Sequence, residues 1–510
     1  MGKRNVTTIR DTIDFLKDQD EIMTIGGEVD PIYEIAGIQK SADGSFAMLF
    51  DSIKGYPAAR CIGNLFATKQ KIAKMFGVND ARKLKFRCLE AIKNPVPPRA
   101  VSEAPCQEVV IDHDIDVLAT LPLIKHSERD CGRLLGGGNT LVMGGHDDHG
   151  SHISFNRMNF RGRDWASINL SIGSHIEEYM LKYKKGEKLP ITINIGTPPA
   201  VMMVAGTSFI HTIVPPGSDE LAIAGGLQGS PVEIVRARTV NAYAIANSEW
   251  VIEGYVNIGG KIWESDEAEQ LGRPGILPFF PEWTGYLGRA ALAFKFEVTA
   301  ITHRKDRPIF YAPLAHSIDV DNLSAPFREA CFYELAERVA PGLCVDVNLP
   351  HGLAPWGGGV VFQVNKRMRR YEGYQRNILM HALSSSIVLR LLIAVDEDID
   401  IYSDEDILFA LTTRLNPSTG IIKGAGGKVM SMMPLEKGSL PAGQIELIGS
   451  QIEGAMALDA TIPFDYKEVF ERACYPVDKV DLRDWLSESE IESIRKRQSK
   501  YARVMAMKGW

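Results

Sequence analysis

The chain is organised around SHISFNRMNFRGRDWASINLSIGSHIEEYM, residues 151–180, in which a polar strand precedes the start of a helix. In HISFNRM, apolar and polar residues alternate, and this period of two predicts a strand. His152 and Ser154 therefore share one face of the strand. Arg157 has the opposite parity, so it reaches that face only if the strand twists, bulges or ends there.

A helix is expected from His175 onward, where the pattern changes to HIEEYMLKYKK. Ser174 is the predicted N-cap, and two glutamates occupy the first turn. The free amide donors at this end of a helix suit a phosphate or a metal-bound anion. The stretch therefore places histidines, serines and an arginine in one predicted cluster.

The composition is that of an ordinary globular protein, with 45% hydrophobic and 24% charged residues. A chain of 510 residues is too long for one core, so two or three domains are expected. The formal charge of -7 argues against nucleic acid as a partner. The seven cysteines include no C-x-x-C pair, which fits reduced thiols in a cytoplasm. No signal peptide or membrane span is indicated, so neither secretion nor membrane insertion is expected.

We expect an α/β protein of several domains. Residues 1–107 mix helix and strand signals, and a small α/β unit is predicted there. Residues 108–325 contain many short strands, among which we count the apolar run AVMMVAG at 200–206, and they predict a barrel or sandwich. Residues 326–510 alternate apolar strands with amphipathic helices, which is typical of a doubly wound sheet, and end in a charged helix from Ser487.

Two histidines and a glutamate, His152, His175 and Glu233, would suit a divalent metal if they converge. Each taken singly is more often a satisfied polar residue, so their spacing leaves both interpretations open. Arg157 follows an apolar strand, where an unpaired guanidinium is costly, and it therefore needs an anionic partner. From the sequence alone, a structural ion pair is the favoured interpretation of that arginine.

Glu282 lies in ILPFFPEWTGYLG, residues 276–288, among two phenylalanines, a proline and a tryptophan. A carboxyl group in apolar surroundings has its pKa raised, which lets it hold a proton near neutral pH and deliver it to a carbanion. An exposed glutamate at the rim of a loop is an equal alternative. The sequence therefore offers Glu282 as a candidate general acid.

Eight motifs follow one another along the chain: APCQEVV at 104–110, the strand that ends in Arg157, GSHIE at 173–177, AGGLQGSPVEIV at 224–235, SEWVIEG at 248–254, PEWTGY at 281–286, DEDIDIYSDEDILFALTTR at 396–414 and LDATIP at 458–463. In this order they resemble the UbiD family of reversible decarboxylases, which use prenylated FMN. The resemblance covers nearly the whole chain. It implies an N-terminal α/β unit, a central split β-barrel like that of flavin reductases, which holds the cofactor, and a C-terminal α/β domain that assembles subunits.

The resemblance also assigns roles. Arg157 is expected to orient the substrate carboxylate, and Glu282 is expected to protonate the substrate carbon after a covalent bond to the cofactor has formed and CO₂ has left. The metal, usually Mn²⁺, is expected on His175, Glu233 and His152, which replaces the usual Asn or Asp, with K⁺ nearby. The cofactor contacts are expected from Ser154, Phe155, Asn156, Arg157, Ser174, His175, Glu233 and Lys366.

The substrate pocket is expected to include Leu277, Phe280, Trp283 and, as a further contact, His316. Members that act on cinnamate-like acids carry a glutamate five residues before the acid, where this chain has Leu277. We therefore expect an aromatic or heteroaromatic acid, as in the protocatechuate-type members. An α,β-unsaturated acid as substrate, or a non-catalytic flavin- or metal-binding scaffold, remain alternatives. The implied partners are CO₂, a flavin prenyltransferase that supplies the cofactor, and further copies of the chain in a dimer or hexamer.

Overall fold

The computed structural model of the chain describes residues 6–144, 150–170, 175–184, 186–353, 358–386, 388–424, 455–470, 472 and 475–498. These residues form two compact units, one up to residue 334 and one from residue 335 onward. The first unit holds both the N-terminal segment and the strand-rich middle of the chain. The finer division at 107 and 325 stays a prediction.

The first unit begins with a four-stranded mixed sheet in the order β1-β2-β3-β18. Helix α1 (Ile9–Asp18) starts at Thr8, whose hydroxyl accepts a hydrogen bond from the Asp11 amide, and buries its apolar side. Strand β18 comes from far along the chain and ties this sheet to the middle segment. The other elements are β1 (Ile22–Val29), α2 (Glu34–Ser41), β2 (Ala47–Ile53), β3 (Arg60–Gly63), α3 (Lys69–Met75), α4 (Leu84–Lys93) and β18 (Ile309–Tyr311).

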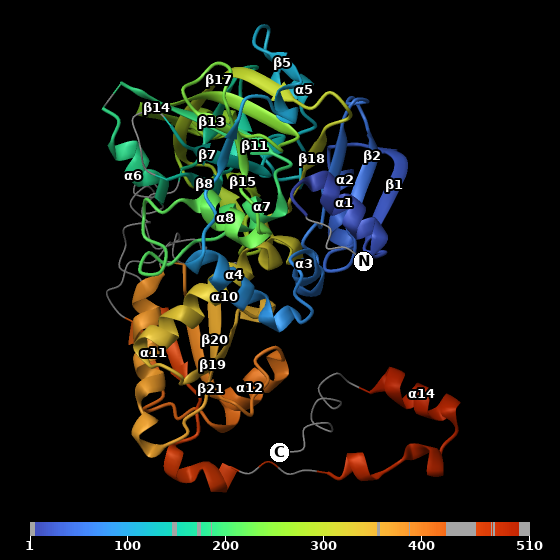
Figure 1. Cartoon of the computed structure of the whole chain (residues 1–510), viewed down its shortest axis with the longest axis vertical. Helices are drawn as coiled ribbons and strands as arrows, with labels where there is room; N and C mark the ends of the chain where they lie inside the picture. Colours follow the sequence, from blue (N-terminus) through green and yellow to red (C-terminus); the bar gives the residue numbers. More distant parts are fainter. Residues whose placement is uncertain are drawn as a thin grey trace. The chain divides into compact units, whose positions relative to one another are not determined.

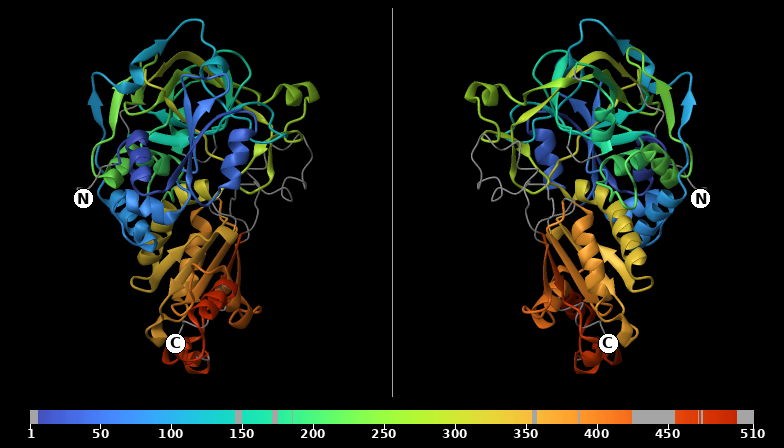
Figure 2. Two further views of the ribbon diagram at one scale, coloured as in Figure 1. Left: turned by 90° about the vertical axis from the view of Figure 1, so that its right-hand side faces the viewer. Right: turned by 90° about the vertical axis from the view of Figure 1, so that its left-hand side faces the viewer.

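A nine-stranded sheet, in which every strand pair is antiparallel, forms the middle of the first unit (Figure 1). Its order is β6-β9-β10-β17-β14-β11-β7-β8, with β5 beside β17, and the pairings shift register twice between β14 (Trp250–Trp263) and β17 (Leu292–His303). Such shifts increase local twist, and the sheet curls into an open half-barrel (Figure 2). The sequence pattern predicted a barrel or sandwich here, and the family resemblance implied a split β-barrel. The remaining strands are β5 (Val109–Ile111), β6 (Leu134–Leu135), β7 (Gly138–Val142), β8 (His152–Phe155), β9 (Met158–Phe160), β10 (Trp165–Ile168) and β11 (Lys188–Ile195).

The strand predicted over HISFNRM is interrupted. Strand β8 ends at Phe155 and β9 begins at Met158, so Asn156 and Arg157 lie between two strands. Arg157 therefore does not follow the alternation of side chains along β8, because the strand ends before it. The sequence had allowed a twist, a bulge or such an end. The helix expected after it is α6 (His175–Leu181), and its predicted cap Ser174 lies outside the described residues.

The run AVMMVAG forms a helix, α7 (Pro199–Ala205), so the predicted strand is wrong there. The helix starts at Pro199, whose fixed φ angle suits the first helical position, and all of its residues are buried. A short run that is buried on every side shows no period, so a strand and a helix look alike in the sequence. Helices α5 (Val117–Thr120) and α8 (Glu220–Gln228) and the small sheet of β4 (Arg99–Val101), β12 (Glu233–Arg236) and β13 (Tyr243–Ile245) complete this region.

A short hairpin carries the candidate acid. It pairs β15 (Pro278–Pro281) with β16 (Leu287–Arg289) and follows helix α9 (Asp266–Leu271). The chain then passes through β17 and β18 into α10 (Ile318–Val339).

The second unit is a five-stranded sheet in the order β19-β20-β21-β23-β22, with parallel pairs at its centre and antiparallel pairs at both edges. Figure 1 shows α11 (Tyr374–Ser385) and α12 (Asp404–Thr413) on opposite sides of it, as the doubly wound prediction requires. The strands are β19 (Cys344–Asn348), β20 (Gly359–Val364), β21 (Leu391–Asp396), β22 (Ile421–Gly424) and β23 (Ala455–Asp459).

The charged helix predicted near the end is α14 (Glu488–Arg497). Ser487 caps it in a reciprocal capping box with Glu490. In the described part of the chain, no helix combines the length and the apolar character needed to cross a bilayer.

Candidate active site

Two histidines and a glutamate converge beside the central sheet. One ligand atom of each of His152, His175 and Glu220 lies within 4.8 Å of the others, and all three side chains are buried. His175 Nδ1 donates to one carboxylate oxygen of Glu220 at 2.7 Å, and His152 Nδ1 lies 3.1 Å from the other. The backbone amide of Ile153 also donates to Glu220, at 2.7 Å. The carboxylate is thus held between two imidazoles.

Local structure explains this convergence. Asp219 caps α8 by accepting from the Ala222 amide, and the hydroxyl of Ser151 donates to the same Asp219 oxygen. The start of α8 is thereby attached to the start of β8, and Glu220 falls in the first turn, where a helix favours negative charge. Burial alone would raise the pKa of Glu220, but the neighbouring imidazoles lower it to about 2. The carboxylate is therefore ionised at neutral pH and available to a cation.

The donor set fits a divalent metal. Nδ1 of His152 and Nε2 of His175 are buried and have no aligned hydrogen bond within the described part of the chain, although the first lies at ion-pair distance from Glu220. Buried polar atoms are nearly always satisfied, so these two nitrogens indicate a missing partner. Imidazole nitrogens together with a carboxylate are common ligands of divalent transition metals.

Glu233, which the sequence analysis placed in this set, lies elsewhere. It belongs to β12 in the small sheet, where Arg99 forms an ion pair with it and Asn247 lies 3.4 Å away. The carboxylate that the structure brings to the histidines is Glu220, because the helix that starts there is the element docked on β8. An acid in the first turn of a helix is so common that the sequence did not single Glu220 out.

A second cluster is built around Arg157. Its Nε and one terminal nitrogen donate to the two oxygens of Glu264 at 2.9 and 2.7 Å, and its other terminal nitrogen donates to Glu282 at 2.7 Å. Burial alone would lower the pKa of Arg157, but the charges of the two glutamates overcome this effect and raise it. The guanidinium therefore stays charged, and its Cζ atom lies 4.5 Å from the centroid of the Phe279 ring.

Glu264, Arg157 and Glu282 form a glutamate–arginine–glutamate trio. Position 277, where members that act on cinnamate-like acids carry a glutamate, is a leucine in this chain. Glu264 directly follows β14, and one of its oxygens also accepts from the Ala291 amide at 2.8 Å. Its carboxylate is buried, with 1% of the side chain exposed. The surrounding sequence, ESDEAEQ, indicates only the acidic first turn of a helix. The pairing of Glu264 with Arg157 could therefore be found only from the fold.

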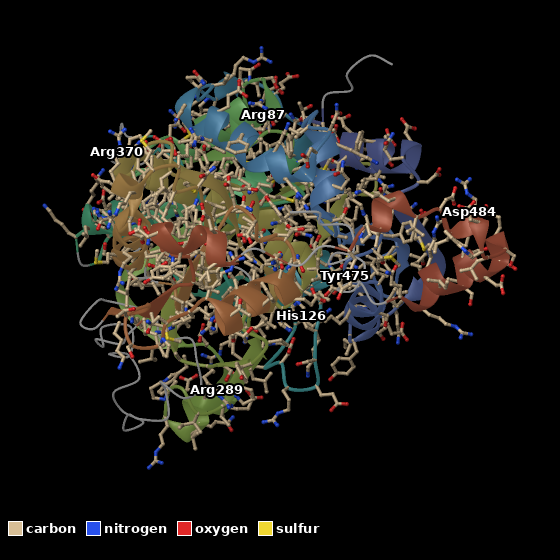
Figure 3. The ribbon with its side chains drawn as sticks, turned by 90° about the horizontal axis from the view of Figure 1, so that it is seen from below. Arg87, His126, Arg289, Arg370, Tyr475 and Asp484 are labelled. Atoms are coloured by element: carbon tan, nitrogen blue, oxygen red, sulfur yellow. The ribbon has the colours of Figure 1, made fainter. Side chains whose placement is uncertain are left out.

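The hairpin of β15 and β16 sets the position of Glu282. The Glu282 amide donates to the Tyr286 carbonyl at 2.8 Å, and Gly285 closes the turn with a φ of 81°. Gly288 lies opposite, where a Cβ atom would come within 2.7 Å of Glu282 Cγ. Arg289, labelled in Figure 3, offers its carbonyl to Arg157 at 3.3 Å. The missing side chain of Gly288 therefore leaves the space that the Glu282 carboxyl occupies.

The expected apolar wall forms beside this cluster. Phe280 and Trp283 are buried, and Leu277 packs, partly buried, against the apolar cluster that contains Phe279 and Phe280. His316 is exposed and its Nδ1 lies 3.1 Å from the Trp283 carbonyl, so it contacts the turn that follows Glu282. His126, labelled in Figure 3, supports the wall with its ring centroid 6.3 Å from that of Phe280.

The segment between the two clusters is polar. Ser154 contacts His152 Nε2 at 3.2 Å, so these two side chains share one face as predicted, and Ser154 also donates to Asn156 at 2.9 Å. The ring of Phe155 lies 6.5 Å from that of Tyr311, within the first unit. Ser174, the remaining expected cofactor contact near them, is outside the described residues.

Lys366 belongs to the second unit and is fully buried there. Its ammonium group donates to Glu372 at 3.0 Å, to Thr461 at 3.0 Å and to the Ile462 carbonyl at 2.6 Å. An ammonium group has three donors, so these contacts satisfy it. A contact of Lys366 with the cofactor stays a prediction.

The chain matches family models along most of its length. Residues 13–87 match the N-terminal domain of 3-octaprenyl-4-hydroxybenzoate carboxy-lyase (UbiD), residues 99–316 its Rift-related domain and residues 321–449 its C-terminal domain. Gallate decarboxylase of Lactiplantibacillus plantarum is 31% identical over 480 residues, which cover 90% of this chain and 94% of that protein.

Solved structures agree. The apo 3,4-dihydroxybenzoic acid decarboxylase AroY of Klebsiella pneumoniae is 30% identical, with a TM-score of 0.81 over 94% of this chain and 99% of that one. An evolved dimeric form of the UbiD-class enzyme HmfF from Pelotomaculum thermopropionicum, in complex with prFMN, is 28% identical, with a TM-score of 0.77 over 94% and 100% of the two chains. The chain therefore belongs to the UbiD family of carboxy-lyases.

Proposed function

We propose that this protein catalyses the reversible, non-oxidative decarboxylation of an aromatic or heteroaromatic carboxylic acid with prenylated FMN. The observation that carries the proposal is the buried network of Glu264, Arg157 and Glu282 beside an apolar wall. Relatives named as gallate, phenolic acid and 3,4-dihydroxybenzoic acid decarboxylases support the substrate class, and the HmfF complex with prFMN supports the cofactor.

The two clusters suit the two ends of a flavin mononucleotide. His152 and Arg157 are five residues apart, which limits their Cα separation to about 17 Å. The metal held by His152, His175 and Glu220 would neutralise the phosphate, with K⁺ nearby, and the residues from Ser154 to Arg157 would follow the cofactor. When bound, prenylated FMN supplies an electron sink through a covalent bond to the substrate.

Counted over the described residues, Arg157 retains one N–H donor for a substrate. A guanidinium has five N–H donors, of which Glu264 takes two, Glu282 takes one and the Arg289 carbonyl takes one. The remaining hydrogen is on the nitrogen that already bonds Glu282. A substrate carboxylate bound there would lie next to Glu282, while Glu264 keeps the guanidinium in one orientation.

Glu282 is the proposed acid. After CO₂ has left, its carboxyl group would deliver a proton to the substrate carbon, and in the reverse direction it would remove that proton. The apolar side chains of Leu277, Phe280 and Trp283 would exclude water, which favours conversion of a charged carboxylate into neutral CO₂. The protein would receive its cofactor from a flavin prenyltransferase and work as a homo-oligomer, like the dimeric form of HmfF.

A second candidate substrate class is an α,β-unsaturated acid. The absence of a trio glutamate at Leu277 had argued against cinnamate-like acids, and Glu264 removes that argument because it supplies the second carboxylate. The choice between an aromatic and an α,β-unsaturated acid therefore rests on the substrates for which the relatives are named, and not on the carboxylates that pair with Arg157.

The test is co-expression with a flavin prenyltransferase, followed by the absorption spectrum of the purified protein and CO₂ release from a panel of acids. We expect turnover of hydroxybenzoates or heteroaromatic acids above that of cinnamate. Cinnamate turnover at a comparable rate would favour the unsaturated-acid alternative. Bound cofactor without CO₂ release from any acid would support a non-catalytic scaffold and refute the proposal.

A further inference from the structure

We infer that the metal site of this chain prefers a divalent ion with high affinity for imidazole, in the class of Co²⁺, Fe²⁺ and Zn²⁺, over Mn²⁺ and Mg²⁺, and that His152 sets this preference. The inference rests on the metal site of the proposed function and concerns which ion that site selects. It is carried by the atoms that His152, His175 and Glu220 present to one another.

The donor set contains two imidazoles and one carboxylate. Oxygen ligands suit Mg²⁺ and Mn²⁺, whereas imidazole suits Zn²⁺, Fe²⁺ and their neighbours in the first transition row. His211 adds to the nitrogen-rich surroundings, because its ring centroid lies 4.9 Å from that of His175. An amide or carboxylate oxygen at position 152 would give a harder site with a single imidazole.

His152 is preorganised to use Nδ1. The hydroxyl of Ser154 lies 3.2 Å from the opposite nitrogen, Nε2, and Ser154 is itself bonded to Asn156. A ligating histidine is commonly oriented by such a bond to its other nitrogen. Nδ1 then points at Glu220 from 3.1 Å, buried and without an aligned hydrogen bond in the described part of the chain.

A structural ion pair explains the cluster less well. Two imidazoles that served only to neutralise Glu220 would be expected to have their remaining nitrogens bonded as well, because they are buried. Nε2 of His175 has no partner among the described residues. The cluster therefore has a ligand nitrogen that is not used within the described residues and is available to bind an ion.

The test is a comparison of metal affinities in the metal-stripped, full-length protein. Free Mn²⁺ is measured by its EPR signal, and bound Co²⁺ is measured by its visible absorption. Each ion is titrated alone and in competition with the other, both with and without FMN. Because Co²⁺ binds most sites more tightly than Mn²⁺, the informative quantity is the change in the ratio of the two dissociation constants on mutation. We expect His152→Asn to reduce the preference for Co²⁺ by at least about 10-fold and to change the Co²⁺ spectrum.

His113→Asn is the matched control, because it removes an imidazole whose side chain is 85% exposed, and the preference should not change. Ser154→Ala is a second variant that retains the imidazole, and it should weaken Co²⁺ binding by about 10- to 100-fold. An unchanged ratio of the two dissociation constants in His152→Asn would overturn the inference while the proposed function stands. A wild-type protein that binds neither ion at one-to-one stoichiometry would instead overturn the metal site of the proposed function.

Discussion

Gly288→Ala should damage catalysis without damaging the fold. Gly288 faces the Glu282 side chain across the hairpin, and a Cβ atom there would lie 2.7 Å from Cγ and 2.8 Å from one carboxylate oxygen of Glu282. The φ angle of Gly288 is not in the left-handed region, so alanine meets no backbone strain. The substitution therefore acts on the position of the carboxyl group.

The size of the effect follows from these distances. Non-bonded carbon atoms rest at about 3.5–4.0 Å, so Glu282 must retreat by about 1 Å. Its hydrogen bond to Arg157 is now 2.7 Å long, and a retreat of that size exceeds the range of a good hydrogen bond. A misplacement of about 1 Å can cost about 10²-fold in rate. We expect kcat to fall by about that factor.

The assay is CO₂ release by the prenylated-FMN-loaded enzyme, together with cofactor content from the absorption spectrum. Gly260→Ala is the control, because a Cβ atom at Gly260 has no neighbour within 4 Å. We expect Gly288→Ala to bind the cofactor like the wild type and to lose rate, and Gly260→Ala to lose neither. Unchanged kcat in Gly288→Ala would show that the position of Glu282 does not limit the reaction and would refute the reasoning.

Three further predictions concern the two clusters. Glu282→Gln should keep the cofactor but slow proton exchange into product by at least about 10²-fold, measured by NMR in D₂O, and wild-type exchange would remove Glu282 from its role. Glu264→Ala should lower the free energy of unfolding by about 3 kcal/mol in urea titrations, because it leaves the buried Arg157 with one carboxylate; a loss below about 1 kcal/mol would contradict this. Glu220 has a depressed pKa in the folded protein, so its contribution to stability is present above its unfolded pKa of about 4.3 and is lost as pH falls towards about 2. Urea titrations of the metal-free wild type and Glu220→Gln should therefore converge over that pH range, and a constant difference would refute this assignment.

The sequence alone predicted many of the local helices and strands and most of the candidate site residues. The alternation in HISFNRM located β8, and Ser487 marked the start of α14. The residue patterns and the family resemblance singled out His152, His175, Arg157 and Glu282 as candidates. These features depend on periods and caps that act over a few residues, so they can be found without the fold. The run at 200–206 was mistaken for a strand because burial on all sides erases the period.

Only the tertiary structure decided which charges meet. Arg157 pairs with carboxylates 107 and 125 residues away, and Glu220 reaches β8 across 67 residues. A sequence contains many acidic residues at helix starts, and nothing local distinguishes the few that packing brings to a buried cation. The packing of α8 and β14 therefore decided that Glu220, and not Glu233, lies beside the two histidines and that Glu264 pairs with Arg157, because burial makes each charge depend on its spatial partner.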